Sequence, residues 1–185
     1  MNHSKRLVQI LRSEITETIS SGCEVGISGG NTSRELLKSL TSLRLLMVDR
    51  WQALSAKEGK VDKRMARFDQ EGMDALQKQA RDQTETYSHR RIILVSDSLT
   101  CAHYIKDHSL DFVFIDAHHS YEAVRDDMNA WYRKVRKGGV FSGHDYGSPG
   151  RRFGVRRAVD EFMERTWNDL QVNNQSRIWW CKVKI

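Results

Sequence analysis

The stretch Cys23-Glu-Val-Gly-Ile-Ser-Gly-Gly-Asn-Thr-Ser33 decides how the rest of this chain is interpreted. A short apolar entry runs into three glycines, Gly26, Gly29 and Gly30, and a helix-like segment follows directly. Glycine permits a turn with positive φ, or a close approach of the backbone to a ligand. A strand that turns through glycines into a helix also presents free backbone N–H groups. Alone, the stretch also fits an ordinary glycine-rich loop; with the segments that follow it, it indicates a nucleotide-type pocket.

Length and composition predict a soluble, globular chain with one domain over residues 1–185. Hydrophobic residues make up 39% and charged residues 29%, and no apolar run approaches the roughly 20 residues of a membrane span. The N-terminus lacks the apolar core of a signal peptide, so we expect a cytoplasmic protein with no membrane partner. Cys23, Cys101 and Cys181 are widely spaced and odd in number, which predicts reduced thiols.

The formal net charge of +6 is compatible with an anionic substrate as well as with nucleic acid. Most basic residues are scattered, and the short basic clusters lack the interleaved aromatic residues of a single-strand groove. We therefore do not expect nucleic acid as a partner.

Three apolar runs after the glycine stretch close on aspartate: Leu43–Asp49, Arg91–Asp97 and Asp111–Asp116. A further run, Val140–Asp145, is expected as the fifth strand and ends in His144-Asp145. Continuous apolar runs of this length suit strands that are buried on both faces of a parallel sheet. The carboxyl ends of such strands share one edge, where open α/β sheets bind ligands. We therefore expect Asp49, Asp97 and Asp116 to meet beside the glycine bend.

The segments between these runs show helical periodicity. The polar stretch 52–88 is longer than an ordinary crossover; we expect one or two surface helices there, broken at Gly72, and its length suits a lid. The chain should close with an antiparallel hairpin of 170–172 and 178–183. The predicted fold is a Rossmann-like, doubly wound α/β sheet, mostly parallel, with seven strands and a C-terminal antiparallel hairpin. The other expected helices are 5–20, 33–40, 99–107, one of about four turns from Tyr121 to Val135 that ends before Lys137-Gly138-Gly139, and one marked by Val155 to Met163.

This order of elements resembles the class I S-adenosylmethionine-dependent methyltransferases over nearly the whole chain. The most specific part is Phe-Ile-Asp-Ala-His-His-Ser-Tyr-Glu122, then Lys-Gly-Gly-Val-Phe-Ser-Gly-His-Asp-Tyr146 and Gly-Val-Arg-Arg-Ala-Val-Asp-Glu-Phe162. It resembles a small branch that includes metal-dependent O-methyltransferases of sugars and natural products.

The resemblance implies S-adenosyl-L-methionine as cofactor. It places Asp49 at the ribose and Asp97 with Ser98 near the adenine; without the resemblance, Asp49 reads equally well as a turn-initiating residue. Asp116 is implied both beside the cofactor and as a metal ligand, and His144 with Asp145 follow the fifth strand where the second ligand pair lies, for Mg²⁺ or Mn²⁺. The first cofactor motif, around the methionine part, is implied at Glu24, Gly26, Ser28 and Gly30, with Ser28 standing where many members have glycine.

Methyl transfer from a sulfonium to a hydroxyl needs an aligned acceptor and removal of its proton. His118 or His119 suits the general base, and Asp145 is the other expected catalytic residue. The alternative for the two histidines is a polar loop before a helix capped by Ser120. Four histidines are expected to be surface or packing residues: His3, His89, His103 and His108.

The expected activity is O-methylation of a small-molecule acceptor. An NAD(P)-binding Rossmann-type oxidoreductase shares the glycine turn, but it does not explain the terminal hairpin and no Tyr-x-x-x-Lys pair occurs. A non-catalytic S-adenosylmethionine-binding module is a further alternative. Methylation of a nucleobase amine is disfavoured because its Asn/Asp-Pro-Pro-aromatic motif is missing. The sequence leaves a homodimer open.

Overall fold

A computed structural model describes residues 2–56, 63, 65–148 and 154–184 of the chain. The described residues form one seven-stranded sheet in the order β3-β2-β1-β4-β5-β7-β6. Neighbouring strands from β3 to β5 pair in parallel, whereas β7 is antiparallel to both β5 and β6. The predicted doubly wound sheet with a closing antiparallel hairpin is thus confirmed. The strands are β1 Ser21–Val25, β2 Arg44–Asp49, β3 Arg91–Val95, β4 Leu110–Ile115, β5 Val135–Gly143, β6 Gln171–Asn173 and β7 Ile178–Lys182.

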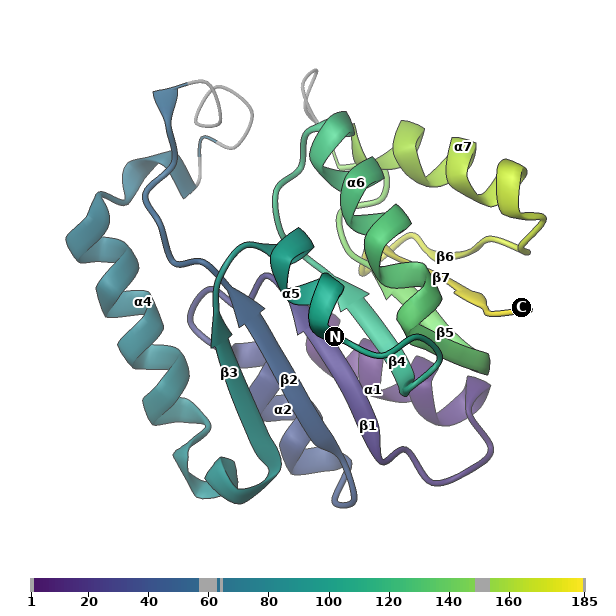
Figure 1. Ribbon diagram of the computed structural model, residues 1–185, viewed down its shortest axis with the longest axis horizontal. Coiled ribbons are helices and arrows are strands. Elements are labelled where there is room, and N and C mark those ends of the chain that lie inside the picture. The colour runs from purple at the N-terminus through teal and green to yellow at the C-terminus, as the bar shows by residue number, and fades with distance from the viewer. Residues whose placement is uncertain (1, 57–62, 64, 149–153, 185) are drawn as a thin grey trace.

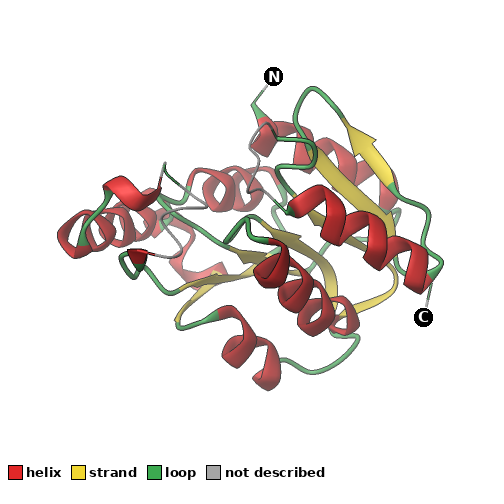
Figure 2. Cartoon of the chain, turned by 90° about the horizontal axis from the view of Figure 1, so that it is seen from above, coloured by secondary structure: helices red, strands yellow, loops and turns green. Residues whose placement is uncertain are grey.

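Helices cover both faces of the twisted sheet (Figures 1 and 2). In Figure 1, α5 and α6 lie in front of the sheet, whereas α1 and α2 lie behind it and α4 stands beside β3. Short 3₁₀ turns complete the connections at Met65–Arg67, Glu85–Arg90 and Tyr132–Lys134. The helices are α1 His3–Glu14, α2 Asn31–Ser39, α4 Gln70–Gln83, α5 Ser98–Tyr104, α6 Tyr121–Trp131 and α7 Val155–Thr166.

The core consists of two hydrophobic clusters, one on each face of the sheet, and β4 contributes to both. Phe112 and Phe114 pack into the cluster that contains α1 and α2, while Val113 and Ile115 pack into the cluster that contains α6 and α7. Successive side chains of a strand point to opposite faces, so a strand covered on both sides is apolar over most of its length. Every residue of β4 is buried accordingly. Asp111, the charged residue of β4, forms an ion pair with Arg136.

The helix expected over 99–107 ends at Tyr104, and two other predicted helix ends are wrong by more residues. The first helix ends at Glu14. Ile15 and Ile19, which were expected in this helix, are buried residues of the connection to β1. The helix from Tyr121 ends at Trp131, and Val135 already belongs to β5. In both places the apolar residues continue at helical spacing beyond the end of the helix. Apolar spacing reports which residues are buried, and a buried residue need not belong to a helix.

The Lys137-Gly138-Gly139 run therefore lies inside β5, where the register against β4 jumps between Leu110 and Phe112. Gly138 has φ of 75°, a conformation that favours glycine. A Cβ on Gly139 would lie 2.5 Å from the carbonyl oxygen of Asp111, so the irregular pairing needs glycine there too. The two glycines thus permit a bulge in the strand.

Gly72 does not break the expected surface helix. It lies in the first turn of α4, where its N–H donates a hydrogen bond of 2.9 Å to the capping carboxylate of Asp69. Part of the segment 52–88, namely 57–62 and residue 64, lies outside the described residues, and a lid role for this segment stays a prediction.

The helices of the described chain include none with the length and apolar character that a membrane crossing requires. Cys23, Cys101 and Cys181 are buried free thiols, as their spacing suggested.

Candidate active site

The glycine bend joins β1 to α2 and lies against the end of β4. The N–H of Gly26 donates to the carbonyl of Val48 at 2.9 Å, and the N–H of Asp116 donates to the carbonyl of Val25 at 2.7 Å. Gly26 has φ of 90°, and a Cβ there would lie 2.2 Å from the carbonyl oxygen of Asp116. Glycine is therefore required because the backbone that carries Asp116 passes directly over the bend.

The carboxylate of Asp49, at the end of β2, fixes the shape of this bend. Its Oδ2 accepts hydrogen bonds from the N–H groups of Ile27 at 2.7 Å and Ser28 at 3.0 Å, and its Oδ1 accepts from Trp51 N–H at 2.9 Å. The indole of Trp51 in turn donates to the carbonyl of Ser28 at 2.9 Å. Ser28 has φ of 52°, so these contacts hold a residue other than glycine in the left-handed conformation.

Glu24 and Gly30 lie at the two ends of the bend, at the end of β1 and the start of α2. Glu24 is only 2% exposed and accepts a short hydrogen bond from the hydroxyl of Ser33. Burial raises the pKa of Glu24 well above its ordinary value, with Ser33 opposing this and the charges of Asp116 and Asp49 adding to it. Gly30 caps α2 with φ of 84°, and a Cβ there would lie 2.8 Å from the Cα of Ala80 in α4.

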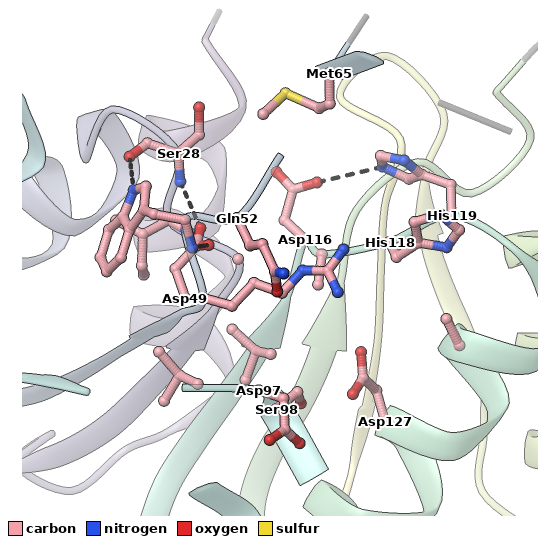
Figure 3. A pocket seen from close by; sticks show the side chains of 18 of the residues that line it. Ser28, Asp49, Gln52, Met65, Asp97, Ser98, Asp116, His118, His119 and Asp127 are labelled. Carbon is pink, nitrogen blue, oxygen red and sulfur yellow. Dashed lines mark hydrogen bonds and ion pairs between the residues drawn. The ribbon is translucent and has the colours of Figure 1, made fainter. Parts of the chain in front are cut away.

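One pocket of about 970 Å³ runs along the carboxyl ends of the strands (Figure 3). The bend, the ends of β2, β3 and β4, and the start of α6 line it, and Trp51, Phe68 and Met73 form part of another wall. The expected meeting of three strand-end carboxylates is confirmed. Three predicted site residues are outside the lining: Gly30, His144 and Asp145. Those that line it are Glu24, Gly26, Ser28, Asp49, Asp97, Ser98, Asp116, His118 and His119.

A cluster of two carboxylates and two histidines lies where β4 and β5 end. Nε2 of His119 lies 2.8 Å from Oδ2 of Asp145 and 3.9 Å from Oδ1 of Asp116. Nδ1 of His144 lies 3.3 Å from Oδ2 of Asp145 and 3.6 Å from Oδ1 of Asp116. The hydroxyl of Ser148 donates to the other oxygen of Asp145, which has φ of 60°. The cluster joins the pocket through Asp116 and His119.

The electrostatics of this cluster keep both carboxylates ionised. Burial acts to raise the pKa of Asp116, but hydrogen bonds with His119 and His144 outweigh it and leave that pKa far below its ordinary value. The same balance lowers the pKa of Asp145. Burial acts to lower the pKa of His144, but hydrogen bonds and charges from Asp116 and Asp145 raise it to about 10. The cluster thus holds Asp116 and Asp145 as negatively charged carboxylates and favours a positively charged group between them.

The donor set also fits a divalent cation. One ligand atom from each of Asp116, His144 and Asp145 can be chosen so that all three lie within 4.8 Å of one another. Two carboxylate oxygens with an imidazole nitrogen suit Mn²⁺ better than Mg²⁺, which prefers oxygen ligands throughout. The Ser148 hydroxyl on the second oxygen of Asp145 would orient that ligand.

The two adjacent histidines have different surroundings. Nδ1 of His118 lies 3.1 Å from the hydroxyl of Ser120 and accepts from the Ser120 N–H at 3.2 Å, and Ser120 caps α6. The loop-and-cap interpretation therefore describes His118. His119 is 4% exposed and faces Asp116 and Asp145, so it is the better candidate for proton transfer.

Sequence reasoning missed His3, which was expected to be a surface or packing residue. It is the first residue of α1, lines the pocket, and stacks on His144 with 4.8 Å between ring centroids. Its Nε2 lies 3.0 Å from the hydroxyl oxygen of Thr32. No local pattern marks it, because its position depends on how α1 packs across the sheet.

Asp127 of α6 was missed as well, although the sequence held a signal. It is a carboxylate on the same helix face as the buried residues Val124, Met128 and Trp131, and it lines the pocket. A charged residue on an apolar helix face is unusual unless it has a partner.

Comparison with known proteins agrees with this geometry. The model of a family described as "Methyltransferase domain" matches residues 23–146, more than half of the chain, so the chain belongs to this family of methyltransferase domains. A search of curated proteins finds no match.

Similar solved structures include the O-methyltransferase NovP, with a TM-score of 0.73, 16% identity, and coverage of 98% of this chain and 79% of that one. A putative caffeoyl-CoA O-methyltransferase from Staphylococcus aureus has a TM-score of 0.69 and 12% identity, covering 98% and 82%. TomG from Streptomyces achromogenes, solved with SAM, has a TM-score of 0.66 and 15% identity, covering 98% and 79%. These structures share the class I methyltransferase fold with this chain.

Proposed function

We propose that this protein transfers the methyl group of S-adenosyl-L-methionine to a hydroxyl of a small molecule. The observation that supports this most is the single pocket in which the Asp49-bonded bend and the Asp97–Ser98 turn meet Asp116 and His119. Family membership supports methyl transfer. The similar structures include O-methyltransferases and a complex with SAM, which supports the acceptor oxygen and the cofactor.

In this proposal the nucleoside lies over the ends of β2 and β3, and the sulfonium points toward β4 and β5. Asp49 keeps the bend open while the remaining lone pair on its Oδ1 accepts from a ribose hydroxyl. The buried apolar wall excludes water from the reacting atoms, which strengthens every charge interaction within the pocket. The protein's main task is then to align the acceptor oxygen with the methyl carbon.

His119 is the group we assign to the acceptor's proton. Nε2 of His119 lies 2.8 Å from Oδ2 of Asp145. Because a carboxylate can only accept, we assign the hydrogen of the neutral ring to Nε2. The neutral ring then has its lone pair on Nδ1, which is the atom that takes the proton. Asp145 holds the tautomer and stabilises the imidazolium that forms. His118 is bound to the cap of α6 and has no part in this step.

Asp116, His144 and Asp145 are the residues that would hold Mg²⁺ or Mn²⁺. Such an ion supplies Lewis acidity, which lowers the pKa of a bound hydroxyl.

The test is a transfer assay that follows S-adenosylhomocysteine release across a panel of phenols, catechols and sugar alcohols. Chelated protein and protein with added Mn²⁺ are assayed in parallel. We expect turnover with at least one acceptor, and a loss of about 10²-fold or more in His119→Gln. His103→Gln, on the exposed surface of α5, is the matched control. Binding of the cofactor without turnover on any acceptor would favour the non-catalytic module, and binding of NAD⁺ in its place would refute the proposal.

A further inference from the structure

Asp127 is a buried carboxyl group that the proposed transfer does not use. It is 6% exposed, lies on α6 and lines the pocket. Figure 3 shows it beside Ser98, at the end of the pocket where Asp97 also lies. Because α5 packs against α6, the start of α5 and the inner face of α6 enclose this end of the pocket.

The hydrogen bonding at this end leaves Asp127 with unused acceptor capacity. Trp131 Nε1 donates to the hydroxyl oxygen of Ser98 at 2.7 Å, so the single hydrogen of that hydroxyl is available to Asp127. Among the residues that the structure describes, no other side chain or backbone group donates to the Asp127 carboxyl. A carboxylate has about four lone-pair sites, so most of those on Asp127 have no donor from the described chain, and the residue lines the pocket.

The electrostatics agree with this shortage of donors. Burial raises the pKa of Asp127 to about 6; the Ser98 hydrogen bond opposes the rise, and the charges of Asp126 and Asp97 add to it. A buried polar group without its full set of partners lowers stability. A ligand that brings hydrogen-bond donors to this point would offset that cost.

The position of Asp127 in the pocket indicates which part of the cofactor would supply hydrogen-bond donors to it. The candidate catalytic cluster lies at the ends of β4 and β5, so the nucleoside must extend the other way, over β2 and β3. Asp97 and Ser98, which follow β3, mark the far end of that path. The base of the nucleoside is therefore the group that reaches the end of the pocket lined by Ser98 and Asp127. This step rests on the proposed function.

We propose that the Asp127 carboxyl accepts a hydrogen bond from the 6-amino group of the cofactor's adenine and so determines specificity for the base. An amino group supplies the donors that the carboxyl lacks. Hypoxanthine carries a carbonyl oxygen at the same position, which places two acceptors face to face. The site then rejects the deaminated cofactor, because a desolvated acceptor would lose its partner.

The test compares the dissociation constants of S-adenosylhomocysteine and S-inosylhomocysteine by isothermal titration. We expect the wild-type protein to prefer the adenine compound by about tenfold to a hundredfold. Asp127→Leu keeps the volume and removes the acceptor, so its preference should fall to about threefold or less. Asp127→Asn keeps a carbonyl oxygen and should retain most of the preference. Asp126→Leu removes the neighbouring carboxylate, which is partly exposed and also lines the pocket; it should keep most of the preference for adenine.

The outcomes separate this inference from the proposed function. If S-adenosylhomocysteine does not bind the wild-type protein, the cofactor assignment fails and this inference fails with it. If it binds but Asp127→Leu keeps the adenine preference, or Asp126→Leu loses it, only the assignment to Asp127 is overturned. Should Asp127→Leu not fold, a crystal structure of the wild-type complex decides. An N6-to-carboxylate distance of about 3 Å supports the contact, and a base bound elsewhere overturns it.

Discussion

Replacing Asp49 by asparagine tests how the bend is held. The carboxylate accepts three backbone N–H groups, two on Oδ2 from Ile27 and Ser28 and one on Oδ1 from Trp51. An amide has one oxygen, so its NH₂ group must face at least one of these donors. Asp49→Asn therefore leaves at least one N–H unpaired, and it also removes the charge that strengthens the other hydrogen bonds.

The expected loss follows from these contacts. A donor left unpaired in a partly buried site costs about 1–3 kcal/mol. For a chain of this length, that corresponds to a fall of about 2–12 °C in the midpoint of thermal unfolding. If the same carboxylate holds the ribose, the dissociation constant of S-adenosylhomocysteine should rise by about tenfold or more, because a charged acceptor is lost at the cofactor.

Thermal unfolding by calorimetry and cofactor titration measure the two effects separately. Asp82→Asn is the matched control, since Asp82 is 62% exposed and its ion pair with Lys78 lies on the surface of α4. It should shift the midpoint by less than about 2 °C and leave cofactor affinity unchanged. A variant Asp49→Asn with wild-type stability and wild-type affinity would show that the carboxylate neither holds the bend nor contacts the cofactor.

Three further variants, with Gly147→Ala as a control for one of them, probe other parts of the site. Asp145→Ala should lower methyl transfer by about 10²-fold or more, while the cofactor dissociation constant from titration changes by less than about threefold. Gly26→Ala should cost about 2–5 kcal/mol in urea unfolding, because the new Cβ meets the carbonyl of Asp116 at 2.2 Å and φ is 90°. Gly147→Ala, with φ of 73° and open space around it, should lose only about 1–2 kcal/mol. Burial raises the pKa of Asp127 from 3.8 to about 6, so the wild type loses stability as pH rises across that window; Asp127→Asn should therefore gain up to about 3 kcal/mol over wild type at pH 7 and almost none at pH 4.

Each of these has a clear contrary result. Equal loss of cofactor binding in the Asp145 and Asp49 variants would contradict the division between catalysis and cofactor binding. Similar destabilisation of the Gly26 and Gly147 variants would mean that the contact with Asp116 does not matter. A stability difference for Asp127→Asn that is the same at pH 4 and pH 7 would mean that ionisation of this carboxyl is not what costs stability.

The fold could be predicted because the parallel strands are mostly apolar runs, several of which are followed directly by an aspartate. The runs that end at Asp49 and Asp116 show this most clearly, and the sheet order then brings them together. Helix ends were harder. Val135 continues the apolar spacing of α6 although it starts β5, and burial alone does not distinguish the two conformations.

The site was predictable only where it follows strand ends. Two features of the site depend on contacts between segments that are distant in the sequence. Gly26 leaves room for the backbone of Asp116, and the ring of His3 packs against that of His144. No periodicity or motif reports such contacts. Asp127 stood on an apolar helix face in the sequence, but its position facing Ser98 depends on how α5 and α6 pack.

The central claim is that the cofactor binds with its reactive sulfur toward the cluster of Asp116, His119 and Asp145. A crystal structure with S-adenosylhomocysteine and Mn²⁺, with the ion located by its anomalous signal, tests it most directly. We predict the ribose at Asp49, the sulfur facing His119, and the anomalous peak between Asp116 and Asp145. A nucleoside bound outside the pocket, or a sulfur pointing away from this cluster, would contradict the account.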